Sequence, residues 1–339
     1  MRAKRLTGGV AALLAVTLPL VACGSDDSSS DGEALRKTTV LLDWDPNPDH
    51  VALYTAKEAG YFEDAGLDVT FQPPSDPSDP TKLVSTGKID IGISYEPETI
   101  ISGSQGLDVV AVGALIPTAL LSVMANGDSP VKSVADLAGH TIGTPGLQTN
   151  DAFLTTILAR NNIDPASVKS VNIGQDLMAA MVAGNVDATL GAYRNIEGVM
   201  MTDQGLNPTI IPVTDAGVPD YDELVIIAQA SRLKSDPAYQ KLIRDFLSGL
   251  ARGNADVIAD PASASKIIAA EADGYDEAQV PKMIDATVPL LKNDKGFGQQ
   301  DVSDWQAFAD WMKSEGLIDK AVTASDVVTN DYLPAGSGS

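Results

Sequence analysis

Few residues in this sequence can carry covalent or metal chemistry. The two histidines, His50 and His140, are far apart and have no evident nucleophile beside them, and Cys23 is the one cysteine in 339 residues. One cysteine cannot form an internal disulfide, and two histidines without further cysteines cannot complete a zinc site. The G-x-S-x-G, G-x-x-x-x-G-K-[ST] and H-E-x-x-H patterns are also absent. These absences disfavour an enzyme, although many enzymes carry no short signature.

Aromatic and acidic side chains instead follow several predicted strands. In α/β proteins the carboxyl ends of the strands form the edge at which ligands bind, so side chains at these positions are candidates for a binding site. The candidates are Trp44 after Thr39–Leu42, Tyr95, Glu96 and Glu98 after Ile89–Ile93, and Tyr193 and Glu197 after Asp187–Leu190.

Strands and helices alternate along the chain, which predicts an α/β fold with parallel sheets. From Pro237 to Leu317 the sequence is mostly helical. The other predicted strands are Gly66–Phe71, Val109–Leu115, His140–Gly143, Val168–Asn172 and Thr209–Pro212, and the clearest helices are His50–Ala59, Asp151–Asn161, Leu177–Ala183 and Glu197–Asp203.

Two apolar runs, Leu120–Met124 and Leu224–Ala228, enclose a self-contained α/β stretch of about 100 residues. This predicts a second lobe inserted into the first, with the chain crossing near 120–127 and 222–229. Two crossings make a hinge, with ligand in the cleft between the lobes. One continuous α/β domain is the alternative. The expected residue ranges are 38–122 and 227–339 for lobe 1 and 123–226 for lobe 2.

The charge balance excludes several classes of partner. With 46 acidic and 23 basic residues the net charge is −23, whereas binding to nucleic acid needs clustered Lys and Arg. Electrostatic docking on an anionic membrane is disfavoured for the same reason. Hydrophobic residues make up 44% of the chain, which is enough for a substantial core.

The N-terminal sequence predicts export. Basic residues in Met1–Arg5 precede the apolar stretch Gly8–Val21, which is short for a transmembrane helix. The following L-V-A-C resembles the lipobox of bacterial lipoproteins, whose cysteine is lipidated after cleavage. We therefore expect a signal peptide at 1–22, lipidation at Cys23, a flexible tether at 23–37, and a location on the extracytoplasmic face of the cell membrane. An ordinary secretory signal is the alternative.

Five segments together resemble the substrate-binding proteins for thiamine-pyrimidine precursors, which serve ABC importers and are related to the fungal enzymes that make the pyrimidine of thiamine. The likeness extends over roughly residues 38–320. The D-W-x-P-N-x-x-H string is fairly specific, whereas E-A-G-Y-F and G-K-x-D-x-G-I-S also occur in binders of sulfonates and nitrate. The segments are LLDWDPNPDH (41–50), EAGYF (58–62), KLVSTGKIDIGISYEPE (82–98), TIGTPG (141–146) and LGAYRNIE (190–197).

This resemblance implies a periplasmic-binding-protein-like fold, with two α/β lobes, a cleft and a two-segment hinge. Its ligand would be a flat heteroaromatic with an exocyclic amine, which needs aromatic walls and polar groups at the ring edge. Trp44 and Tyr193 are the expected walls, and Glu197 would accept hydrogen bonds from the amine and a protonated ring nitrogen. Further expected ligand-binding residues are Asp43, Asn47, His50, Tyr95, Glu96, Gly146 and Asn195.

Each of these assignments has a structural alternative. Trp44 would otherwise be a core residue, and Glu197 an acidic residue favoured at a helix N-terminus. Asn47 precedes Pro48 and is also suited to a turn, while Asn195 and His50 are also suited to a helix start.

Two departures from the resembled family bear on function. In the fungal enzymes a lysine that holds pyridoxal phosphate and a histidine consumed as substrate follow the G-K-x-D-x-G segment, and a cysteine-rich motif lies downstream. Here Ile93–Glu98 has neither residue, so no Schiff base can form there. Arg194 stands where an aromatic residue is expected, and if it points inward it would suit an anionic ligand.

We therefore expect the solute-binding component of an ABC importer, which captures a small heteroaromatic, namely a thiamine-pyrimidine precursor of the hydroxymethylpyrimidine or formylaminopyrimidine type. The expected partners are that ligand, a membrane permease and the membrane through the lipid anchor, with the protein as a monomer. No cofactor, catalytic residue or metal is expected. A riboflavin precursor, a sulfonate-like anion and a pyrimidine-synthase-like enzyme remain as alternatives.

Overall fold

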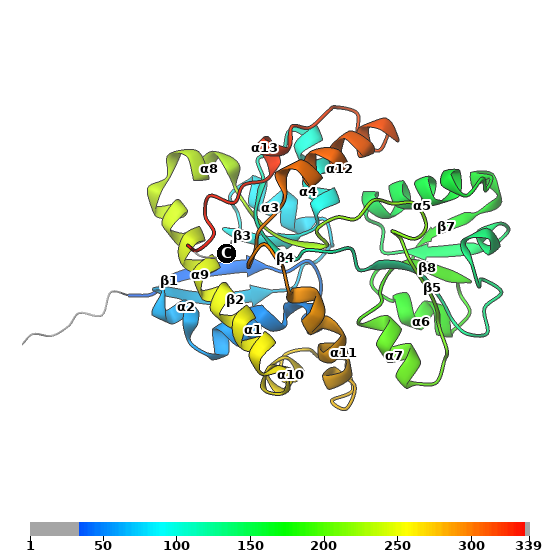
Figure 1. Cartoon of the computed structure of the whole chain (residues 1–339), viewed down its shortest axis with the longest axis horizontal. Coiled ribbons are helices and arrows are strands. Elements are labelled where there is room, and N and C mark those ends of the chain that lie inside the picture. Colours follow the sequence, from blue (N-terminus) through cyan, green and yellow to red (C-terminus); the bar gives the residue numbers. More distant parts are fainter. Residues whose placement is uncertain (1–33, 336–339) are drawn as a thin grey trace, which may run out of the picture. The chain divides into compact units, whose positions relative to one another are not determined.

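The structure is a computed structural model that describes residues 34–335 (Figure 1). The predicted signal peptide and the predicted lipidation site Cys23 lie outside the described residues. The first strand begins at Arg36, inside the predicted tether 23–37, so the folded part starts slightly earlier than expected. Among the described residues, no helix combines the length and apolar character needed to cross a membrane.

The first sheet has the strand order β2-β1-β3-β10-β4. Strand β1 pairs in parallel with β2 and with β3, whereas β10 is antiparallel to both of its neighbours, β3 and β4. The strands are β1 (Arg36–Leu41), β2 (Leu67–Gln72), β3 (Ile91–Ser94), β4 (Val110–Ile116) and β10 (Leu224–Ala228).

Helices cover both faces of this sheet, which explains why β10 is a continuous apolar run. Leu224 and Ile226 belong to the core packed by α9, while Val225 and Ile227 belong to the core packed by α12. The helices on the α9 side are α1 (Val51–Glu58), α9 (Pro237–Ala259) and α10 (Pro261–Ala269), and those on the α12 side are α3 (Asp79–Ser85), α4 (Glu96–Gln105), α12 (Val302–Ser314) and α13 (Ala324–Val327).

Shorter elements complete this part of the chain. The long stretch from Pro237 to Leu317 is mostly helical, as expected. The additional helices are α2 (Tyr61–Asp64), α8 (Ala230–Ser235) and α11 (Val280–Thr287), with short 3-10 helices η1 (Pro48–His50) and η4 (Val288–Leu291).

The second sheet has the order β7-β6-β8-β5-β9. Helix α5 packs on one face through Phe153 and Ile157, and α6 and α7 pack on the other through Met181 and Met201. The elements are β5 (Leu121–Ala125), β6 (Thr141–Thr144), β7 (Lys169–Asn172), β8 (Ala188–Tyr193), β9 (Thr209–Pro212), α5 (Gln148–Arg160), α6 (Leu177–Val182) and α7 (Glu197–Asp203), with 3-10 turns η2 (Val134–Leu137) and η3 (Pro165–Ser167).

The prediction of parallel sheets is wrong for one strand in each sheet. Strand β10 is antiparallel in the first sheet, and β5 is antiparallel to β8 and β9 in the second. Each of these is the first strand that the chain forms after it crosses from the other sheet. The entering strand therefore runs against its neighbours, and its first residues lie at the edge where the parallel strands end.

The chain crosses between the sheets in segments 117–120 and 213–223, just before β5 and β10. Both predicted lobe boundaries, after residues 122 and 226, fall inside these strands. The two crossing segments are joined by side chains. Asp220 accepts the Ala119 N–H at 2.9 Å, and Glu223 Oε2 accepts the Leu120 and Leu121 N–H groups at 2.6 and 3.0 Å. Two carboxylates thus hold the crossings together.

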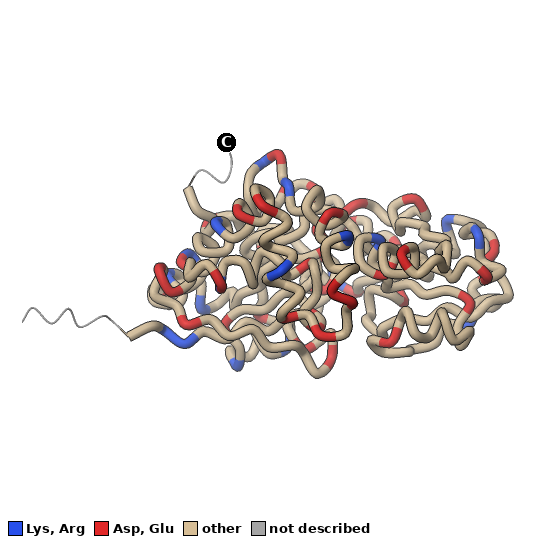
Figure 2. The backbone as a smooth tube through the Cα atoms, turned by 90° about the horizontal axis from the view of Figure 1, so that it is seen from below, with Lys and Arg blue, Asp and Glu red and all other residues tan. Residues whose placement is uncertain are grey.

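Acidic residues are spread along the described chain rather than gathered in one segment (Figure 2). This distribution is typical of a solvated surface that keeps a protein soluble. The overall charge therefore does not mark a binding site.

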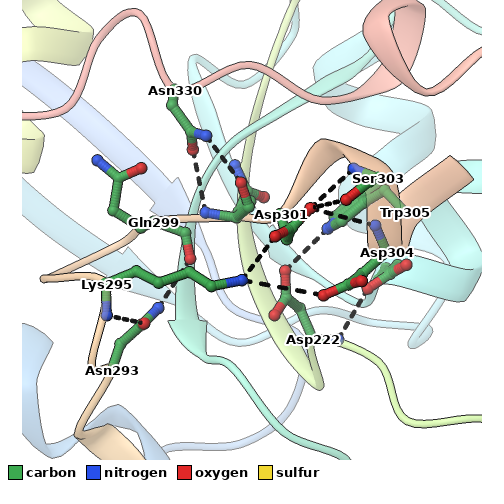
Figure 3. Close-up of polar contacts among 11 residues, drawn as sticks. Asp222, Asn293, Lys295, Gln299, Asp301, Ser303, Asp304, Trp305 and Asn330 are labelled. Carbon is green, nitrogen blue, oxygen red and sulfur yellow. Dashed lines mark hydrogen bonds and ion pairs between the residues drawn. The ribbon is translucent and has the colours of Figure 1, made fainter. Parts of the chain in front are cut away.

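One polar cluster packs against the second crossing, and we call it the hinge-side cluster (Figure 3). The Trp305 indole N–H donates to Asp222 at 2.8 Å, and Glu96 Oε2 accepts the Asp222 N–H at 2.8 Å. Lys295 lies 2.6 Å from Asp301 and 3.9 Å from Asp304. The cluster consists of Glu96, Asp222, Lys295, Asp301, Asp304 and Trp305.

Candidate functional site

A cavity lies where the parallel strands of both sheets end and the entering strands begin. The space between its lining atoms is about 630 Å³, open solvent at the mouth included. The lining residues are Asp43, Trp44, Asn47, Tyr95, Pro97, Leu121, Pro145, Leu147, Thr149, Asn150, Leu177, Gly191, Tyr193, Ile196, Glu197, Tyr221, Glu223 and Tyr275.

Aromatic rings form much of the cavity wall. Trp44 and Tyr275 are half-buried, and both come from the part of the chain that carries the first sheet. Tyr193, at the end of β8, faces them from the second. Such rings offer flat apolar surfaces to a flat ligand. Burial raises the pKa of Tyr95 and of Tyr193 well above the usual value, so both hydroxyl groups act as hydrogen-bond donors at neutral pH.

Asp43 is held by two donors behind the cavity. His50 Nε2 lies 2.8 Å from Asp43 Oδ1, and the Tyr95 hydroxyl donates to Oδ2 at 2.9 Å. His50 Nδ1 accepts the Asn47 N–H at 3.2 Å, so the imidazole proton is on Nε2 and points at Asp43. His50 is fully buried and acts by orienting this carboxylate.

Glu197 begins α7 and presents a half-buried carboxylate to the cavity. Its Oε2 accepts the Tyr193 N–H at 2.8 Å. Burial raises the pKa of Glu197, and hydrogen bonds from backbone N–H groups partly offset that rise. The carboxyl group is thus fixed at the cavity wall by backbone donors, and its other oxygen is available to a ligand.

Glu223 is the second carboxyl group of the cavity fixed by neutral donors. Its Oε2 accepts the two backbone N–H groups of the first crossing and the Tyr221 hydroxyl at 3.0 Å, and its Oε1 accepts the Tyr193 hydroxyl at 3.1 Å. Burial is the main cause that raises the pKa of Glu223. Glu223 therefore links the cavity to both crossing segments.

The cavity is rich in hydrogen-bond acceptors. Asp43, Glu197 and Glu223 line it, whereas no Lys, Arg or His is among the described residues that do so. Asn150 adds an Oδ1 atom that is buried and lacks a partner among the described residues. An anion here would meet carboxylates without a compensating cation, so the cavity suits a neutral or cationic molecule that carries several N–H donors.

A protein-family model, described as NMT1/THI5 like, matches residues 47–264, which is more than half of the chain. The chain belongs to the NMT1/THI5-like family. Within this family's relatives, a formylaminopyrimidine-binding protein of Halalkalibacterium halodurans is 31% identical over 95% of this chain and 98% of its own length. The 4-amino-5-hydroxymethyl-2-methylpyrimidine phosphate synthase THI13 of Saccharomyces cerevisiae is 26% identical over 88% of each chain.

Solved structures support the same fold for this NMT1/THI5-like chain. The alkanesulfonate-binding protein SsuA from Xanthomonas axonopodis pv. citri, bound to MOPS, has a TM-score of 0.70 at 18% identity and covers 87% of this chain and 99% of its own. The predicted periplasmic-binding-protein-like fold is therefore confirmed. Its two α/β lobes are built on the two sheets, and the two crossings form the hinge.

Six of the predicted ligand-binding residues line the cavity of this family member. They come from the ends of three parallel strands, where the prediction put them. Whether they contact a ligand stays a prediction. They are Asp43, Trp44, Asn47, Tyr95, Tyr193 and Glu197.

Four other predicted residues do not line the cavity, each for a different reason. His50 lies behind Asp43, and Glu96 faces the hinge-side cluster. Gly146 is exposed and has a φ of +89°, and a Cβ atom there would collide with the Asn172 side chain. Asn195 is turned away from the cavity toward lobe 1 and binds Asp49 and Thr287 there.

Arg194 also does not line the cavity. Its guanidinium group donates to the Ala119 carbonyl oxygen at the first crossing. The residue that would have favoured an anionic ligand is therefore used in the hinge.

Twelve of the eighteen lining residues were not predicted, and the aromatic and acidic ones among them are Tyr221, Glu223 and Tyr275. Tyr221 and Glu223 directly precede β10. The prediction considered only residues that follow parallel strands, and it expected β10 to be parallel, so it did not include residues at the start of this strand. The sequence signal that could have indicated them is the group of acidic residues just before an apolar run, PDYDELVIIA (219–228). Tyr275 comes from the loop between α10 and α11, and we find no sequence signal for it. Among the described residues, no group of His, Cys, Asp and Glu could hold a metal ion.

Proposed function

We propose that this protein is the solute-binding component of an ABC importer and captures an aminopyrimidine precursor of thiamine, of the formylaminopyrimidine or hydroxymethylpyrimidine type. The observation that carries the proposal is the position of Glu197, a backbone-anchored carboxyl group between aromatic walls in a cavity without lining cations. The name of the Halalkalibacterium halodurans relative supports the same ligand class.

Each group in the cavity has a role in this proposal. Trp44 and Tyr193 cover the two faces of the pyrimidine ring. Glu197 accepts from the exocyclic amine and the adjacent protonated ring nitrogen, because paired, charge-assisted hydrogen bonds of this kind are strong. Asp43, oriented by His50 and Tyr95, supplies a second negative edge. The ligand contacts both lobes and so favours the closed state by its differential affinity.

We infer that the protein binds this ligand without transforming it. Relatives that are named synthases belong to the same family, so the inference rests on the residues of this chain. No lysine is among the described residues that line the cavity, and a Schiff base with pyridoxal phosphate needs one.

We further propose that the protein acts on the extracytoplasmic face of the cell membrane, anchored by a lipid at Cys23, as a monomer that delivers its ligand to a permease. The lipobox-like sequence L-V-A-C supports the anchor. Mass spectrometry of the membrane fraction tests it, and a Cys23→Ala variant that remains in that fraction contradicts it.

A thermal-shift panel of pyrimidines, flavin precursors and alkanesulfonates tests the ligand, because a specific ligand raises the unfolding temperature by mass action. We expect formylaminopyrimidine or hydroxymethylpyrimidine to give the largest shift. A shift produced only by sulfonates, or only by flavin precursors, contradicts the proposed ligand. An imine absorbance after addition of pyridoxal phosphate contradicts the inference that the protein is a binder.

A further inference from the structure

A second contact between the lobes lies outside the cavity lining. Asn195, on the segment after β8, donates through Nδ2 to Asp49 Oδ1 at 2.6 Å and to Thr287 Oγ1 at 2.8 Å. Asp49 lies in η1 and Thr287 ends α11, so both acceptors belong to the part of the chain that carries the first sheet. All three residues are at most 2% exposed. We call this group the latch.

The latch contains two acceptors that have no partner. Asp49 Oδ2 and Asn195 Oδ1 are buried, and neither has a hydrogen bond within the described residues. Leaving buried polar atoms unpaired is costly, so such a pair calls for an explanation. A carboxylic acid and a primary amide pair through two bonds, from amide N–H to acid oxygen and from acid O–H to amide oxygen. The first of these bonds is present, and one proton on Asp49 Oδ2 supplies the donor for the second.

The charges around Asp49 favour that proton. Burial is the main cause that raises the pKa of Asp49 well above its usual value. The hydrogen bond from Asn195 lowers this pKa, and the negative charges of Asp43, Glu197 and Glu223 raise it. Tyr275 also interacts electrostatically with Asp49, and burial is the main cause that raises the pKa of this tyrosine.

No cation offsets these charges on the elements packed against η1. His50 directs its ring proton to Asp43. Lys57 and Glu58 on α1, Lys266 on α10, and Lys282 and Asp285 on α11 are exposed to solvent.

We propose that Asp49 is held as a neutral carboxylic acid whose pairing with the Asn195 amide latches the two lobes together, so that closure takes up one proton from solvent. No covalent bond forms or breaks, and the proton binds Asp49 Oδ2. Thr287 fixes the amide by accepting its second N–H. The proposal concerns lobe closure and rests on the proposed function only for the probe that drives closure.

Titration calorimetry with formylaminopyrimidine between pH 5.5 and 8.5, in buffers of different ionisation enthalpy, tests this proposal. For the wild type we expect proton uptake on binding and an affinity that falls as the pH rises. Asp49→Asn carries a permanent N–H in place of the acid O–H, so it should retain binding, exceed the wild type at high pH and take up one proton fewer. Asp49→Ala and Asn195→Leu should weaken binding roughly tenfold or more at low pH, because each leaves a buried group unpaired.

Two controls isolate the latch from other ionising groups. Asp45→Asn makes the same charge change at an exposed position of the same loop and should behave as the wild type. Glu197→Gln removes the carboxyl group proposed to bind the ligand, and proton uptake by Asp49 should remain detectable in this variant. A proton uptake and pH dependence of Asp49→Asn equal to those of the wild type overturn the proposal.

Failure of the proposed ligand is distinguishable from failure of the latch. If the wild type does not bind formylaminopyrimidine, the proposed function fails, and thermal unfolding of the free protein still tests the latch. The gain in unfolding temperature of Asp49→Asn over the wild type should then grow as the pH rises. A gain that is constant from pH 5.5 to 8.5 overturns the latch.

Discussion

The end of the second crossing, residues 219–223, separates two acidic regions that are organised in opposite ways. On the cavity side, Glu197 and Glu223 are held by backbone N–H groups and tyrosine hydroxyls, all of them neutral. On the other side, in the hinge-side cluster, Lys295 lies between Asp301 and Asp304 (Figure 3). Neutral donors orient a carboxylate without cancelling its charge, whereas a lysine cancels it.

This difference suits the cavity to ligand binding and the hinge-side cluster to stabilising the fold. The cavity is lined by carboxyl groups without a lining cation among the described residues, and in the proposed function a donor-rich ligand pairs with them. The hinge-side cluster pairs two of its four carboxyl groups with Lys295 and fixes α12 against the crossing through Trp305 and Asp222. Counts of acidic residues do not distinguish the two, but the identity of the donors does.

The largest loss of ligand affinity is expected from a substitution at Glu197, on the cavity side. Glu197→Gln keeps the shape of the side chain but replaces one acceptor oxygen by an amide group, so an aminopyrimidine loses a charge-assisted bond. We expect an affinity loss of about 1–3 kcal/mol by calorimetry. Glu277→Gln, at an exposed position near Tyr275, is the matched control and should change nothing. An unchanged affinity in Glu197→Gln removes Glu197 from the site.

A smaller loss is expected at the aromatic wall. Trp44→Leu retains an apolar surface but lacks the flat ring, so we expect the affinity for a pyrimidine to fall by about 0.5–1.5 kcal/mol. Trp305 of the hinge-side cluster is not a usable control because it is buried in the core. Trp311, which is only partly buried, serves instead, and Trp311→Leu should leave ligand affinity unchanged. Equal losses in both variants contradict a specific role for Trp44.

The hinge-side cluster should show its effect in stability instead of ligand affinity. Burial raises the pKa of Asp222 from 3.8 to about 6, so the folded state binds a proton more tightly than the unfolded state. Its stabilising contribution is therefore present below about pH 4 and is lost as the pH rises through about 6. Asp222→Asn still accepts from Trp305 and should avoid this loss.

The test compares urea unfolding of Asp222→Asn and wild type at pH 4.5, 6 and 7.5. We expect the stability difference to shift in favour of the variant as the pH rises. Asp304→Asn, whose side chain is 79% exposed, should show a flatter dependence. Parallel pH profiles for Asp222→Asn and the wild type would refute the assignment.

The smallest effect is expected at Lys295. Its side chain is 57% exposed, and exposed ion pairs contribute only about 0.2–1 kcal/mol. Lys295→Met should lower the free energy of unfolding by that amount and leave ligand affinity unchanged. A loss of ligand affinity in this variant means that the hinge-side cluster takes part in binding, and the comparison between the two regions then fails.

Much of the fold was predictable because local patterns coincide with tertiary packing. Apolar runs such as Thr39–Leu42 and helices such as Glu197–Asp203 lie close to where the patterns put them. Strand direction was not predictable in this way. Leu224–Ala228 reads the same whether it is parallel or antiparallel, and only pairing with β3 and β4 decides between the two.

The candidate site was predictable to the extent that it follows strand ends. Trp44, Tyr95 and Tyr193 line the cavity for that reason. His50 and Asn195 share the same segments but turn toward other polar groups, and residue type does not determine that direction. The predicted lobe boundaries fall inside β5 and β10 because the crossings were expected near 120–127 and 222–229, at the apolar runs that form these strands.

The bonds between Asp220, Glu223 and the first crossing have a practical consequence. Backbone N–H groups of the first crossing bond to side-chain oxygens of Asp220 and Glu223, so substitution of these two residues changes the contact between the crossings without altering the main chain. The bending resistance of such a joint can be tuned by exchanging a carboxylate for an amide while both sheets keep their pairing. Because Glu223 also lines the cavity, Asp220 is the position of the two at which the contact between the crossings can be changed while the cavity lining stays intact.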